Sequence, residues 1–306
     1  MRNNKQFRYR HNFSFIVFAG LSLSLANAVW AFLLSIAESK NGDPVATGIT
    51  MAIGLVPIGL ILMYLNKGKF DFSVYPVLTG VFFGTSNILL LSIFSYRDSA
   101  VIYPLIAPTI IVFVIMQVLV NRRSMDSKGA AKLVIGGAVA GAGFILLSLS
   151  GLDVSIISFH DILISLVLIV SYGITGFLLT ETGLKSKNTG SSMLTVAIAE
   201  IAAMLLFYPF YAAKFSYVGV QYSFLAGFVV SFGIAFSFVG YKTLSKSKKA
   251  ISYSSILYIL SEMETLFLVV IYSIFVGSLT LATVASIALI AASVWYLSME
   301  SDKALG

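Results

Sequence analysis

The stretch "DILISLVLIVSYGITGFLLT", residues 161–180, has a single charged residue, Asp161 at its first position, and is apolar over most of its length. A bilayer core of about 30 Å is crossed by a helix of about 20 apolar residues. A strand of a membrane barrel would alternate apolar and polar side chains, and this stretch does not. It therefore predicts one membrane-spanning helix.

Similar apolar runs fill most of the remaining chain, and the polar gaps between them are too short to hold a soluble domain. The chain is 58% hydrophobic and 11% charged, whereas soluble domains are about 25% charged. The sequence therefore predicts an all-α membrane protein. Its ten expected transmembrane helices are the runs 13–37, 45–65, 73–96, 100–120, 129–149, 161–180, 191–211, 223–244, 251–276 and 280–298.

The basic residues predict the orientation of these helices. With the N-terminus in the cytoplasm, only Lys40, Arg97 and Lys214 of the 20 lysines and arginines fall in outer segments. Cytoplasmic segments of membrane proteins are rich in these residues. We therefore expect both termini in the cytoplasm and a multi-pass protein of a plasma (inner) membrane. The net charge of +7 then reflects topology and contact with anionic lipid, not a nucleic-acid partner.

Residue types exclude several chemistries. The chain has no cysteine, so it has neither disulfides nor a thiolate metal site. Its two histidines, His11 and His160, fall in polar segments, which leaves no histidine-based zinc site and no serine-hydrolase triad. The stretch GGAVAGAG (136–143) is not a phosphate loop, because it lies within an apolar run and no Lys-Ser/Thr pair follows it. We expect no cofactor, no metal and no enzyme activity.

The ten runs divide into two sets of five, in residues 1–152 and 153–306. Because five is odd, the second set enters the membrane from the opposite side, which is the inverted-repeat plan of many transporters. Each set closes with a helix of small residues, GGAVAGAG (136–143) and LATVASIALIAAS (281–293). Gly137 and Gly141 form a GxxxG pair, which favours close helix packing. We expect these two helices as one route to a homodimer.

Three blocks resemble the drug/metabolite transporter superfamily, EamA type, and the likeness extends over nearly the whole chain. They are LANAVWAFLLS (25–35), the proline, polar hairpin and glycine-rich helix within 99–148, and LSEMETLFLVVIYSIFVGSLT (260–280). Thr265 stands where the family has proline, and Asn121 and Ser278 stand where it has glutamate. The resemblance implies transport of small organic solutes through a cavity lined by the first, third, fourth, sixth, eighth and ninth helices.

Three of the thirteen acidic residues lie deep in apolar runs, Glu200, Glu262 and Glu264, and no lysine or arginine lies at comparable depth. A charged side chain at the bilayer centre costs about 2.5–3.5 kcal/mol on insertion scales. Burial disfavours the charged form, so such a carboxyl can load and release a proton. Alternatively it can pair with a cationic substrate.

Helical geometry separates the two acids of the run 251–276. At 100° per residue, Glu262 and Glu264 lie about 200° apart on one helix. Glu262 shares a polar face with Tyr258, so we expect Glu262 to line the cavity. We expect Glu264 to pack against another helix, with Glu200 as a protonated partner, and the resemblance implies a structural or gating role for it. The alternative for Glu262 is a protonated acid bonded to a neighbouring helix.

Other polar and aromatic residues are candidates for the same cavity. Asn27 and Asn87 lie near the centre of their helices, where such groups usually bond across helices. Trp30, Tyr103 and Tyr172 are expected as an aromatic wall, with membrane-interface packing as the alternative. Pro104 and Pro108 interrupt backbone hydrogen bonds and permit a kink suited to gating.

These observations predict a secondary transporter that moves a small organic solute, such as an amino acid, an amine or another metabolite, by alternating access. The expected partners are this solute, protons as the coupling ion, and the lipid bilayer. An uncoupled facilitator of the same fold is the nearest alternative. A membrane scaffold has little loop surface for partners, and an intramembrane enzyme would need a nucleophile or metal set that the three glutamates do not supply.

Overall fold

The computed structural model of the chain describes residues 2–41, 43–70, 72–95, 102, 105–121, 125, 127–151, 158–211, 216–245, 250–264, 267 and 281–299. Within these ranges the protein is helical and contains no strand, as the sequence predicts. The helices are α1 (Arg2–Asn41), α2 (Pro44–Leu65), α3 (Val74–Phe94), α5 (Thr109–Val120), α6 (Ser127–Gly151), α7 (Phe159–Lys185), α8 (Thr189–Leu205), η2 (Tyr208–Phe210), α9 (Tyr217–Leu244), α10 (Ala250–Ser261) and α12 (Leu281–Met299).

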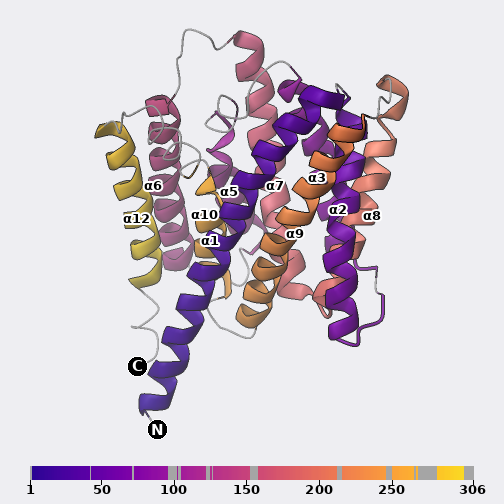
Figure 1. Cartoon of the computed structure of the whole chain (residues 1–306). Coiled ribbons are helices and arrows are strands. Elements are labelled where there is room, and N and C mark those ends of the chain that lie inside the picture. Colours follow the sequence, from indigo (N-terminus) through magenta and orange to yellow (C-terminus); the bar gives the residue numbers. More distant parts are fainter. Residues whose placement is uncertain are drawn as a thin grey trace.

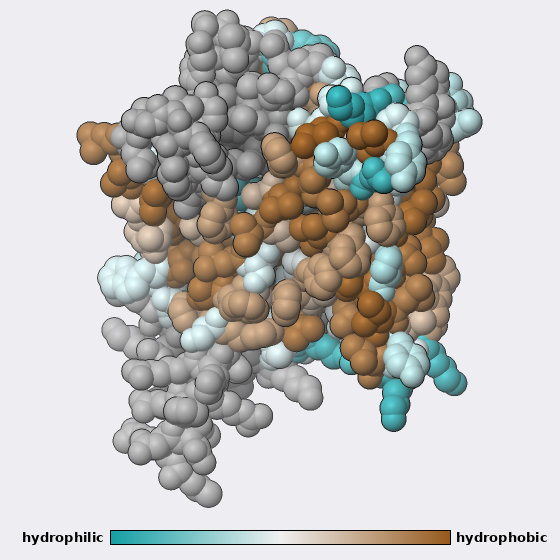
Figure 2. Space-filling model, viewed as in Figure 1, coloured by the Kyte–Doolittle hydropathy of each residue, from teal (hydrophilic) through white to brown (hydrophobic). Residues whose placement is uncertain are grey.

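In the described part of the chain, eight helices are long and apolar enough to cross a membrane, namely α1, α2, α3, α6, α7, α8 with η2, α9 and α12. The helices α5 and α10 are shorter, at 12 residues each. Apolar side chains cover the middle of the visible face, and hydrophilic residues gather at its two ends (Figure 2). The protein is therefore an integral, multi-pass, α-helical membrane protein.

Polar caps set where several helices begin. Asp43 Oδ1 accepts hydrogen bonds from the backbone N–H groups of Val45 and Ala46, at 2.9 and 3.0 Å. Ser158 and Asp161 form a reciprocal capping box at the start of α7. The first N–H groups of a helix have no partner within the helix, so these side chains satisfy them where lipid offers no water.

Helices from the two halves of the sequence interleave (Figure 1). Helix α1 packs along α9 and α10, and α7 packs along α3 and α5. Helix α2 packs on α8 and α9, while α8 packs on α2 and α3. At one edge of the bundle α6 and α12 lie side by side and reach α5 and α10. These neighbours show a symmetry between the two halves. Each packing pair named above becomes another such pair, or itself, when α1 is exchanged with α7, α2 with α8, α3 with α9, α5 with α10 and α6 with α12.

The start of α1 and the end of α12 lie at the same end of the bundle (Figure 1). Helices α7 and α9 also end there. Lys185 Nζ donates to the Tyr75 hydroxyl at the start of α3 at 2.7 Å, and Lys242 Nζ donates to the backbone oxygen of Lys187 at 3.0 Å. We call this end, with Lys185, Lys187 and Lys242, the basic end.

The glycines of α6 face neighbours in the same chain. Gly137 and Gly141 lie against Val114 and Ile111 of α5, and other glycines of α6 accommodate side chains of α12. The GxxxG pair therefore serves packing within the protomer. A homodimer through α6 and α12 stays a prediction, and it would use their outer faces, where Trp295 is exposed.

The crossing of α2 and α9 depends on two facing glycines. A Cβ on Gly227 would overlap the backbone oxygen of Met51 and lie 3.1 Å from Gly54 Cα. A Cβ on Gly54 would overlap the backbone oxygen of Phe224. The two backbones approach this closely only because neither position carries a side chain.

We predict that Gly227→Val separates α2 from α9 and destabilises the protein by about 1–3 kcal/mol, the usual cost of overpacking. The measurement is the thermal unfolding midpoint of the purified protein in detergent. The matched control is Ala138→Val, which adds a larger side chain at an exposed position of α6. Equal midpoints for the two variants would contradict the close crossing.

Candidate functional site

The predicted helix 100–120 is interrupted near its middle. Helix α5 begins at Thr109, directly after a turn at Ala107 and Pro108. Pro108 occupies the N-cap position, and its carbonyl accepts the N–H of Ile111 at 3.0 Å. Pro108 therefore breaks the run as its chemistry predicts. The other two candidates in this run, Tyr103 and Pro104, lie outside the described residues.

The predicted helix 251–276 is interrupted as well. Helix α10 ends at Ser261, and Glu262 and Met263 form a turn. The N–H of Met263 bonds to the carbonyl of Leu260, three residues back, at 3.3 Å. The expectation of one continuous helix through residue 264 is wrong. The placement of Glu264 on the face opposite Glu262 is therefore wrong too, because a rotation of 100° per residue does not hold across a turn.

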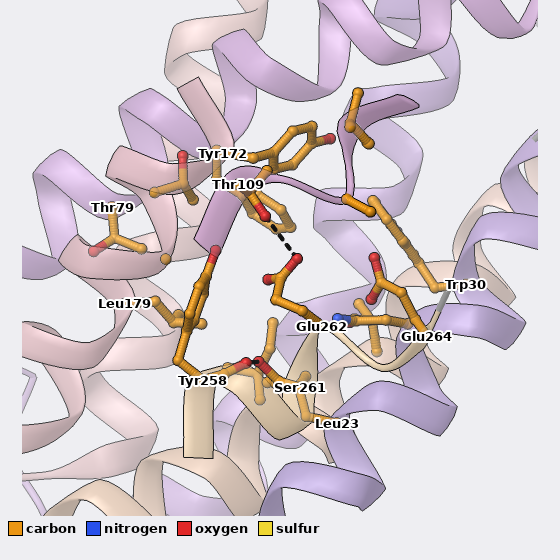
Figure 3. Close-up of a pocket in the computed structure, with 18 of the residues that line it drawn as sticks. Leu23, Trp30, Thr79, Thr109, Tyr172, Leu179, Tyr258, Ser261, Glu262 and Glu264 are labelled. Atoms are coloured by element: carbon orange, nitrogen blue, oxygen red, sulfur yellow. Dashed lines mark hydrogen bonds between the residues drawn. The ribbon is translucent and has the colours of Figure 1, made fainter. Parts of the chain in front are cut away.

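A cavity of about 90 Å³ lies where these two breaks meet (Figure 3), with room for several water molecules or a small solute. It is walled by α1, α3, α7, α8, α9 and α10 together with the two breaks. Six sequence candidates line it. The lining residues are Leu23, Asn27, Trp30, Thr79, Phe83, Ile106, Ala107, Thr109, Tyr172, Thr175, Gly176, Leu179, Val196, Val230, Ile234, Tyr258, Ser261, Glu262 and Glu264.

Glu262 connects the two breaks. Thr109 Oγ1 donates a hydrogen bond to Glu262 Oε2 at 2.8 Å, and Tyr258 lies within hydrogen-bond reach of the same carboxyl. Thr109 is the first residue of α5, where the N–H groups lack helical partners and the helix dipole favours negative charge. Glu262 and Tyr258 thus lie together in the cavity wall, and Glu262 is also bonded to a neighbouring helix.

Glu264 has a different environment in the same wall. Its side chain is 8% exposed, and Oε2 has no hydrogen-bond partner among the described residues. Asn27 of α1 lies within hydrogen-bond reach of this carboxyl. Glu264 and Trp30 lie on one side of Glu262, and Tyr258 lies on the other (Figure 3). The two carboxyl groups are close enough to interact electrostatically.

Aromatic rings give the cavity a rigid wall. The Trp30 ring stacks on Phe83 with ring centres 6.3 Å apart, and its Nε1 donates to Met51 Sδ at 2.9 Å. The Tyr258 ring stacks on Phe113 at 3.8 Å. These contacts hold both rings in place at the cavity. The same aromatic residues can therefore pack against neighbouring helices and also form a wall of the cavity.

Glu200 and Asn87 lie behind this wall rather than in it. The Tyr172 hydroxyl, at the cavity, donates to Asn87 Oδ1 at 2.7 Å, and Asn87 Nδ2 donates to Glu200 Oε1 at 2.8 Å. Both residues are fully buried, and neither lines the cavity. The expected Glu264–Glu200 bond is absent among the described atoms, because Glu200 bonds to Asn87 instead. The two hydrogen bonds, from Tyr172 to Asn87 and from Asn87 to Glu200, connect α7, α3 and α8.

Sequence reasoning missed several lining residues, and part of the signal was present. Thr79 and Phe83 precede Asn87 by eight and four residues, so all three share one face of α3. Thr109 follows Pro108 directly, at the position where a helix can begin. Ser261, the last residue of α10, carried no comparable signal, because nothing in the sequence marks the break there.

Close contacts between α3 and α7 separate the cavity from the basic end. The hydroxyls of Thr79 and Thr182 lie 2.8 Å apart. One turn further, Lys185 bonds to Tyr75 and pairs with Glu181 at 2.7 Å. We call this row of contacts the α3–α7 seam. Thr79 itself lines the cavity, so the seam begins at the cavity wall.

No protein-family model matches the sequence, and no curated protein is similar to it in sequence. Several solved structures are similar to this chain, and one of them, described only as the crystal structure of a protein, has a TM-score of 0.64. The match covers 96% of this chain and 99% of the other, at 15% identity. At that identity the likeness shows a shared fold alone, and it supports the arrangement of helices described above.

We predict that Asn87→Leu destabilises the protein by about 1–3 kcal/mol, because Tyr172 and Glu200 each lose a buried hydrogen bond. Thr85→Val on the same helix is the control, since the Thr85 hydroxyl donates to the Val81 carbonyl within its own helix. Thermal unfolding in detergent measures both. A loss of stability no larger than that of the control would show that the Tyr172–Asn87–Glu200 hydrogen bonds do not stabilise the protein.

Proposed function

We propose that the protein is a secondary transporter that moves a small organic solute across the membrane by alternating access. The observation that carries this proposal is the meeting of two interrupted helices at a buried, carboxyl-lined cavity. Transporters place substrate and coupling-ion sites where discontinuous helices meet near the middle of the membrane. Such breaks are tolerated in a bilayer only where they are buried in protein or line a cavity.

The proposal includes ten spans arranged as two inverted five-helix repeats, 1–152 and 153–306, with both termini in the cytoplasm. Two observations support it. The exchange of helices between the halves maps the main packing pairs described above onto one another. The breaks before α5 and after α10 fall in helices that this exchange pairs. The asymmetry of lysines and arginines supports this orientation, and the proposed location is a plasma (inner) membrane.

Proton coupling is assigned to Glu262. It lies in the cavity wall, and Thr109 at the start of α5 stabilises its charged form. Loading a proton removes this charge and weakens the bond that joins the two breaks. The chain has no phosphate-binding loop motif for ATP, so ion or solute gradients supply the driving force. The resemblance to EamA-type drug/metabolite transporters agrees with this proposal.

We predict that Glu262→Gln abolishes solute-driven proton movement, to the level of protein-free liposomes. The measurement uses purified protein in liposomes with a trapped pH dye and a panel of amino acids, amines and nucleobases. Asp302→Asn, which removes a carboxyl from the polar C-terminal segment, is the control and should keep the signal. Proton movement unchanged in Glu262→Gln would refute coupling, and solute uptake without a proton signal would favour the uncoupled facilitator.

Alternating access requires the α3–α7 seam to open, and a disulfide can test this. The chain contains no cysteine, so the pair Thr79→Cys and Thr182→Cys introduces the only thiols, at positions whose hydroxyls lie 2.8 Å apart. We predict that oxidation stops solute flux and that reduction restores it. Each single variant should transport under both conditions. Full flux in the cross-linked protein would show that the seam does not move.

A further inference from the structure

The cavity has a one-sided charge. Its described lining residues include two carboxylic acids, Glu262 and Glu264, and no lysine, arginine or histidine. Its remaining polar groups are one amide, the Trp30 indole N–H, three threonine hydroxyls, one serine hydroxyl and two tyrosine hydroxyls. A ligand's carboxylate or phosphate would therefore meet two acids without a basic partner, and burying an unpaired charge is costly.

The N-terminus of α5 is the part of the cavity wall that would best bind an anion, and a carboxyl of the protein already occupies it. The N-terminus of α5 opens at Thr109, where a helix favours negative charge. Glu262 occupies this position through its bond to Thr109. An amino acid would bring a second carboxylate to the same place. The geometry therefore disfavours zwitterions as well as anions.

Of the two cavity acids, Glu264 is the one whose carboxyl is only partly paired, with Asn27 within hydrogen-bond reach. Its Oε2 atom is buried without a hydrogen bond among the described residues, and its carboxyl points toward the enclosed space next to Trp30 (Figure 3). Charged groups in a membrane interior are paired or are protonated. Nothing described in the protein supplies the cation, so a ligand in the cavity can.

The neighbours of Glu264 suit an organic ammonium group. Trp30 and Phe83 present aromatic rings, and a ring face attracts ammonium groups within about 6 Å of its centre. Asn27 supplies an amide beside the carboxyl. The rest of the wall is mostly aliphatic and aromatic, with Leu179, Val230 and Ile234 among its members. Such a wall fits an apolar body attached to the charge.

We propose that this cavity selects small organic ammonium ions and that Glu264 is the seat of the ammonium group. The proposal rests on the transport function proposed above and names its substrate class. Glu262 then remains the proton carrier, held by Thr109, while Glu264 determines charge specificity. Two acids two residues apart in the sequence thus have separate roles in one cavity.

Binding can be measured without transport, because the chain has two tryptophans. Trp30 lines the cavity, and Trp295 is exposed on α12. Trp295→Phe leaves Trp30 as the single fluorescent reporter at the proposed seat. Three ligands that share a phenyl body are titrated at neutral pH, namely benzylamine, phenylglycine, which adds a carboxylate to benzylamine, and phenylacetate.

The expected result is that benzylamine changes Trp30 fluorescence saturably, phenylglycine binds much more weakly, and phenylacetate does not bind. In Glu264→Gln the dissociation constant for benzylamine should rise about 30-fold or more, as for loss of one partner of a buried charge pair. Glu262→Gln should keep the preference for benzylamine over phenylacetate. The ligand series in the Trp295→Phe protein tests charge selection even where Glu264→Gln fails to fold.

Three outcomes would overturn the proposal. These are equal binding of benzylamine and phenylglycine, an unchanged benzylamine constant in folded Glu264→Gln, and displacement of benzylamine by sodium ions, which would assign the seat to an inorganic cation. Failure of the transport proposal looks different. In that case benzylamine binds through Glu264, but liposomes containing the protein show neither uptake nor proton movement.

Discussion

A helix that ends inside a membrane leaves backbone N–H and C=O groups without water, and the protein must provide their partners. Here two helices are interrupted in the interior of the bundle, before α5 and after α10. The bond from Thr109 to Glu262 joins the two interruptions. This bond gives the Glu262 carboxyl a hydrogen-bond donor and places an acidic group at the start of α5. The cavity exists because the two breaks meet there.

This arrangement links the content of the cavity to the geometry of both halves. A change in the charge of Glu262 alters its bond to α5, which belongs to the other half of the sequence. The Tyr172–Asn87–Glu200 chain extends the cavity wall outward to α3 and α8. The α3–α7 seam starts at Thr79 in the same wall. A ligand in the cavity would therefore contact the helices whose separation the proposed transport cycle requires.

The membrane class and the positions of the helices could be predicted from the sequence, because lipid imposes a length and a composition on every span. Proline marks the break only in the first half of the sequence, at Pro108. In 258–264 neither proline nor glycine is present, so the break after Ser261 arises from tertiary contacts. The partnership of Glu200 with Asn87 likewise joins helices far apart in sequence, and helical periodicity along one segment does not reveal it.

The error over Glu264 is itself informative. On a continuous helix, residues i and i+2 point in nearly opposite directions, so one cavity cannot receive both carboxyls. The turn at Glu262 and Met263 removes this restriction, and both acids line the same space. Acids at positions i and i+4 of a continuous helix could also face one cavity. Both carboxyls would then lie on an uninterrupted helix. The break lets one acid bond to the start of α5, while the other lies beside Trp30 and Asn27 with one oxygen unpaired among the described residues. That difference in environment is the basis of the two proposed roles, in which one carboxyl carries a proton and the other selects a cation.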